Sequence, residues 1–99
     1  MIRLFAVLMI MICSPSAASD LVSLEKEVVV FAQEHPDQAY ETFMTGIESG
    51  ASTEEQAIYL YGIGLANEQL GNTEEAINDY IGAEILGFGK ASEALKRLS

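Results

Sequence analysis

Two pairs of adjacent glutamates, Glu54-Glu55 and Glu74-Glu75, are the side chains of this sequence best suited in type to acid–base chemistry. Catalysis by two carboxyl groups requires that both face one cleft and that their pKa values be held apart. Each pair instead follows a residue typical of a helix N-cap, Ser52 or Asn72, with a glutamate three places later. Negative charge is favourable there because the first backbone N–H groups of a helix lack partners. We therefore interpret both pairs as helix starts.

The other candidate groups for chemistry are isolated. His35 is the only histidine, which is too few for a metal site, and its place before Pro36 favours a turn or cap role. The Gly62-Ile63-Gly64 segment lacks the third glycine and the preceding strand of a dinucleotide-binding loop, so close helix packing is the better interpretation. No second histidine is present to activate a serine or threonine. The sequence predicts a protein that is not an enzyme and binds no cofactor or metal.

Residues 1–18 have the pattern of a secretory signal peptide. Arg3 is their only charge, Leu4–Ile12 is an unbroken apolar run, and the small residues Ser16-Ala17-Ala18 suit a cleavage site after position 18. The run is much shorter than the roughly 20 apolar residues of a spanning helix, so we expect no stable membrane insertion after cleavage. An uncleaved anchor and a lipoprotein acylated at Cys13 remain alternatives. The expected location is periplasmic or secreted, in a bacterial source.

The composition is strongly acidic. The 99 residues include 15 acidic and five basic side chains, for a net charge of −10, and loss of Arg3 with the signal peptide would make it −11. No basic stripe is available to phosphates, which argues against nucleic acid as a partner. The charge favours solubility and a basic partner. Cys13 is the only cysteine, so residues 19–99 should form one domain without a disulfide.

The spacing of apolar residues predicts five helices and no strand. Gly50, Gly71 and Gly87 should each end a helix, and Pro36 suits the first position of another. The predicted helices cover about residues 20–33, 36–49, 52–70, 72–86 and 90–98. The breaks between them are short, so the expected fold class is all-α, built from antiparallel helical hairpins.

The chain contains an internal repeat with a constant shift of 37 residues. A pattern of small, aromatic, small and glycine residues occurs twice with the same spacing, first as Ala39, Phe43, Gly46 and Gly50 and then as Ala76, Tyr80, Ala83 and Gly87. On a helix such positions lie along one stripe that ends at a stop signal. A fixed period of this length indicates stacked helical hairpins.

The segment from about Ala57 to Lys90 resembles a tetratricopeptide (TPR) repeat. The residues that carry the resemblance are Leu60, Ile63-Gly64, Gly71, Ala76, Tyr80 and Ala83. Leu60 stands where the family often has Trp, Asn67 where it prefers an aromatic residue, and Phe88 where it usually has Pro. Gly87-Phe88-Gly89 is closer to the related Sel-one-like repeats, which remain the variant interpretation. Gly64 should let the two helices of the hairpin approach closely, with the Tyr80 ring beside them.

The resemblance implies a short α–α superhelix with a concave groove for a protein or peptide. By that resemblance, Tyr61, Leu65 and Glu68 would be partner-binding residues, with the core as the alternative place for Tyr61 and Leu65. The expected function is an exported, non-enzymatic TPR-like adaptor or scaffold in the bacterial envelope. The alternative is a structural or self-associating subunit of an envelope assembly, since so short a stack could gain stability from a homo-oligomer. Glu27 takes the place of Gly64 in the earlier copy, so the first hairpin should not pack as closely as the second. The first hairpin is either a true repeat or a cap.

Overall fold

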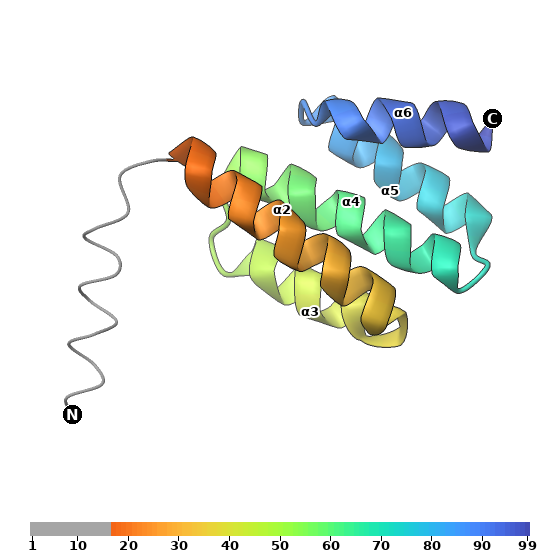
Figure 1. Cartoon of the computed structure of the whole chain (residues 1–99), viewed down its shortest axis with the longest axis horizontal. Coiled ribbons are helices and arrows are strands. Elements are labelled where there is room, and N and C mark those ends of the chain that lie inside the picture. Colours follow the sequence, from red (N-terminus) through yellow and green to blue (C-terminus); the bar gives the residue numbers. More distant parts are fainter. Residues whose placement is uncertain (1–16) are drawn as a thin grey trace.

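The computed structural model describes residues 17–99, and within that range the chain is all-α, with no strand. Its five helices are α2 (Ala17–Glu34), α3 (Pro36–Glu48), α4 (Thr53–Gln69), α5 (Thr73–Ile85) and α6 (Gly89–Leu98) (Figure 1). The predicted fold class, number of helices and helical hairpins are confirmed. The predicted signal peptide lies outside the described residues, except that its last two positions begin α2.

Helix α4 lies in the middle of the stack, with α2 and α3 against one side and α5 and α6 on the other (Figure 1). The hairpin of α4 and α5 is the most closely packed pair of helices. Helix α2 contacts α4 more extensively than it contacts its own hairpin partner α3. This difference agrees with the expectation that Glu27, at the place of Gly64, keeps the first hairpin from closing as tightly.

Local signals in the sequence set most of the helix ends. Ser52 accepts a hydrogen bond from the backbone N–H of Glu55, and the Glu55 carboxylate accepts one from the backbone N–H of Ser52, which completes the predicted capping box. Gly71 and Gly87 end α4 and α5 with positive φ angles of 83° and 101°, a conformation in which a side chain is strained. Asn72 occupies the predicted N-cap position of α5, before Thr73. Its side chain makes no cap hydrogen bond to α5.

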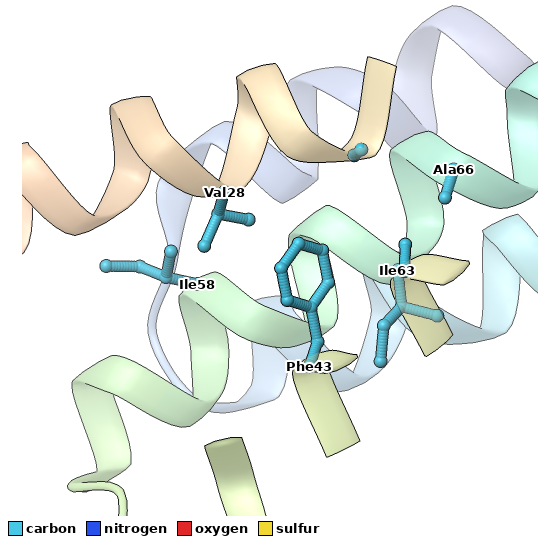
Figure 2. Close-up of a cluster of buried hydrophobic side chains, with 7 residues drawn as sticks. Val28, Phe43, Ile58, Ile63 and Ala66 are labelled. Carbon is cyan, nitrogen blue, oxygen red and sulfur yellow. The ribbon is translucent and has the colours of Figure 1, made fainter. Parts of the chain in front are cut away.

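The core consists of two clusters, one on each side of α4. The first joins α2, α3 and α4, and Figure 2 shows its side chains Val28, Phe43, Ile58, Ile63 and Ala66 directed toward one another. The second surrounds the fully buried Tyr80 with alanines of α5 and α6, namely Ala76, Ala83, Ala91 and Ala94. Because α4 is covered on both sides, it carries apolar residues around most of its circumference.

Two glycines of α4 allow these close approaches. A Cβ atom at Gly62 would collide with the side chains of Val28 and Phe43, and one at Gly64 would lie 2.6 Å from a ring carbon of Tyr80. The predicted close packing of Gly64 against α5 is confirmed, with Tyr80 as its nearest neighbour. Gly62 likewise allows Val28 of α2 and Phe43 of α3 to pack closely against α4 in the first core cluster.

None of the described helices combines the length and the apolar character of a membrane-spanning helix.

Candidate binding groove

The three residues predicted to bind a partner lie on one face of α4. Tyr61, Leu65 and Glu68 are four and three residues apart, which brings them into line on a helix. Together they line two adjoining depressions of about 310 Å³ each, which α4 shares with residues of α2 and α6. We call the two depressions together the α4 groove. Its other lining residues are Gln33 of α2, Gln69 of α4, and Lys90, Glu93, Ala94 and Arg97 of α6.

Glu68 joins three helices inside this groove. Its carboxylate accepts a hydrogen bond of 2.5 Å from the Tyr80 hydroxyl of α5. It also accepts two from the guanidinium of Arg97 in α6, at 2.8 and 3.1 Å. The hydrogen bonds from Arg97 are the main cause that lowers the pKa of Glu68, against the effect of burial. Glu68 therefore stays ionised and holds α6 in place, as well as lining the groove.

Tyr80 remains a hydrogen-bond donor in this arrangement. Its side chain is fully buried, and burial, with the Glu68 carboxylate next to it, raises the pKa of its hydroxyl. A protonated hydroxyl between a buried ring and a carboxylate fixes the position of both partners. The Tyr80 ring thus belongs to the second core cluster, while its hydroxyl binds Glu68 of the groove.

Tyr61 is partly core and partly groove. Its ring lies 5.0 Å from the ring of Phe88, edge to face, and 5.6 Å from the ring of Tyr80, measured between centroids. Burial raises the pKa of its hydroxyl. The side chains of Tyr61 and Leu65 are nevertheless only partly buried. Tyr61 borders one depression, and Leu65, which packs against both core clusters, borders the other. Tyr61 and Leu65 therefore contribute both to the core and to the lining of the groove.

Two cations of the groove were missed by the sequence analysis. The ammonium of Lys90 donates to the carboxylate of Glu25 and ties α6 to α2, and Arg97 pairs with Glu68. A signal for their placement is present in the repeat, because Ala57 of α4 and Ala94 of α6 are also 37 residues apart and both are buried. Helix α6 therefore corresponds to α4 in the next copy of the repeat, and it borders the groove face of α4.

The α4 groove combines partly buried side chains with polar and charged ones. Its floor is formed by half-buried side chains, and its borders carry amides and charges of both signs. Within residues 17–99 no three His, Cys, Asp or Glu side chains are grouped so as to hold a metal ion. No family model, curated protein or solved structure matches this chain.

Proposed function

We propose that this chain is a non-catalytic binding module that holds a protein segment in its α4 groove. The observation that carries the proposal is the alignment of Tyr61, Leu65 and Glu68 along one face of α4, in a hollow bordered by α2 and α6. A partly buried aromatic ring with one side packed on a core is a typical anchor in protein interfaces, because little conformational entropy is lost when it binds.

A basic segment is the partner class favoured by charge. The charges that line the groove balance, with Glu68 and Glu93 against Lys90 and Arg97. Lys90 is also paired with Glu25 beside the groove, so the excess negative charge comes from the carboxylates around it. The whole chain has a net charge of −10. Attraction to such a surface would speed the encounter with a basic segment and weaken as salt rises, because screening acts beyond about 8 Å at physiological ionic strength.

The resemblance to TPR repeats and the N-terminal pattern extend the proposal to an exported adaptor or scaffold of the bacterial envelope. Processing after position 18 is its most direct test. N-terminal sequencing of protein isolated from cells should begin at Ser19. A mature chain that still begins at Met1, or one that carries lipid on Cys13, would contradict it.

The groove is tested by cross-linking followed by titration. A photoreactive residue at Gln69, on the groove border, should capture a partner in its native source, whereas the same residue at the exposed Asn78 of α5 should not. With that partner purified, Tyr61→Ala should weaken binding by about 2 kcal/mol or more, as for an interface hot spot.

A second variant separates binding from stability, because Tyr61 also packs on the core. Gln69→Lys adds a cation at the groove border and should weaken binding of a basic segment without changing the melting temperature. The matched control is Gln38→Lys, which makes the same change at an exposed position of α3. Equal affinity of the two lysine variants, or binding that is indifferent to salt, would contradict a basic partner in this groove.

Self-association is the alternative function, and one surface favours it. Ile81 and Ile85, one turn apart on α5, are 41% and 76% exposed. If two copies meet there, sedimentation should detect an oligomer that Ile85→Ser dissociates, while the Gln69→Lys variant remains associated. A monomer at all concentrations would exclude this alternative.

A further inference from the structure

An apolar pocket extends the same face of α4 toward its N-terminus. The pocket has a volume of about 160 Å³ and lies between the first half of α2, the first half of α4 and the turn that joins α5 to α6. Its apolar lining consists of Leu21, Val22, Ala57, Ile58, Leu86 and Phe88. Ala57 and Ile58 are almost fully buried and Val22 is 54% exposed, so the pocket runs from the first core cluster to the surface.

The pocket continues the α4 groove rather than forming a separate site. With 3.6 residues per turn, Ile58, Tyr61 and Leu65 fall on one face of α4. Phe88 lines the pocket and contacts Tyr61, which lines the groove. The ion pair of Lys90 and Glu25 stands between the two hollows, since Lys90 borders the groove and Glu25 borders the pocket.

Size and charge together indicate what the pocket can hold. An apolar cavity of about 150 Å³ accommodates a benzene ring, so this one suits a single Leu-sized or Phe-sized side chain. Two carboxylates, Glu25 and Glu54, border it. Lys90 neutralises Glu25, whereas no hydrogen bond or ion pair from residues 17–99 engages the exposed carboxylate of Glu54. An unpaired anion beside an apolar hollow complements a cation beside an apolar group.

We propose that this pocket receives a branched or aromatic apolar side chain of the partner segment, with a neighbouring Lys or Arg of that segment paired to Glu54. The inference rests on the proposed function, and it specifies the sequence of the segment: one large apolar residue flanked by basic ones. Burial of the apolar side chain supplies most of the affinity, and the basic neighbour supplies the preference over acidic or neutral segments.

Three capped tripeptides test the proposal on the full chain, with the methyl resonances of Ile58 and Leu86 as the readout. Ac-Lys-Leu-Lys-NH2 should shift these resonances in a saturable way. Ac-Lys-Ala-Lys-NH2, which lacks the apolar side chain, should bind about tenfold more weakly. Ac-Glu-Leu-Glu-NH2, which keeps it but reverses the flanking charges, should also bind about tenfold more weakly.

A pair of matched variants isolates Glu54. Glu54→Gln should weaken Ac-Lys-Leu-Lys-NH2 about threefold. Glu74→Gln makes the same change at the second residue of α5, as Glu54 is the second residue of α4, and should leave binding unchanged. Equal losses in the two variants, or equal binding of the Lys-flanked and Glu-flanked peptides, would overturn the proposal.

The readout also distinguishes the pocket from the groove. If the peptides shift the resonances of Tyr61 and Leu65 while those of Ile58 and Leu86 stay unchanged, the pocket assignment is wrong and the proposed function stands. If the pocket resonances shift as expected but the natural partner binds the Tyr61→Ala and Gln69→Lys variants normally, the pocket stands and the groove assignment fails.

Discussion

Three equivalent positions of the repeat carry apolar residues in the first copy and polar or charged residues in the second. Positions 31, 43 and 60 correspond to positions 68, 80 and 97 through the shift of 37 residues. The first set is Phe31, Phe43 and Leu60, and the second is Glu68, Tyr80 and Arg97. In both sets the first two residues are in direct contact across the helix hairpin, so the geometry of the contact is kept while its chemistry changes.

The apolar contact and the polar contact differ in what they can respond to. The rings of Phe31 and Phe43 meet edge to face, 5.5 Å apart, and such a contact depends on burial and not on pH. The second contact is directional and includes a titratable carboxylate. It binds α6 to the hairpin through Arg97, on the side where the groove lies. The difference indicates that the second half of the molecule combines packing with an electrostatic connection.

The two hairpins also differ at a position that affects how closely their helices approach, which is Gly64 in the second hairpin and Glu27 in the first. The largest effect is expected for Gly64→Leu, because Tyr80 is fully buried and held by its hydroxyl, so its ring cannot move aside. Overpacking should destabilise the fold by about 3 kcal/mol, measured by urea unfolding. Helix propensity alone predicts stabilisation.

The matched variant Glu27→Leu places the same side chain at the equivalent, exposed position of the first hairpin. It should change the free energy of unfolding by no more than about 0.5 kcal/mol. A Gly64→Leu protein that melts higher than the wild type would show that the second hairpin is no tighter than the first.

Tyr80→Phe converts the second contact toward the first and should have the next largest effect. The variant keeps the ring but removes a hydrogen bond to an ionised carboxylate, and it should lose about 1.5 kcal/mol of unfolding free energy. The control is Tyr59→Phe, since within the described residues the Tyr59 hydroxyl makes no hydrogen bond, and its loss should be close to zero. Equal stabilities of the two variants would mean that the Tyr80 hydroxyl contributes nothing.

Arg97→Gln should have the smallest effect and should reveal the pH response. The pKa of Glu68 is lowered in the folded chain, so its ionised form contributes stability above its unfolded pKa of about 4.3. That contribution is lost as the pH falls through the folded pKa. Because Arg97 is largely exposed, the variant should lose about 0.2–1 kcal/mol at pH 7.

The difference between Arg97→Gln and wild type should shrink as the pH falls from 7 to 3, followed by urea unfolding at several pH values. Lys96→Gln is the control, because Lys96 lies in the same last turn of α6 and, in the described part of the chain, has no ion pair. A constant difference across the range, or the same pH response in the control, would mean that the connection between α4 and α6 is not electrostatic.

The sequence by itself determined the helices and where most of them end. The capping box of Ser52 and Glu55 and the glycine stops at Gly71 and Gly87 involve atoms only a few residues apart, so their geometry follows from local chemistry. The repeated stripe of Ala76, Tyr80 and Ala83 predicted the buried face of α5 for the same reason, because helical spacing brings such residues into line.

Only the tertiary structure decided which side chains meet across the helices. Arg97 reaches Glu68 over 29 residues and Lys90 reaches Glu25 over 65, and no local pattern relates them. Asn72 has the residue type of an N-cap, yet its side chain donates to Asn67 of the preceding helix. Spacing along a helix selects a face, but the neighbour of that face depends on how all the helices pack together.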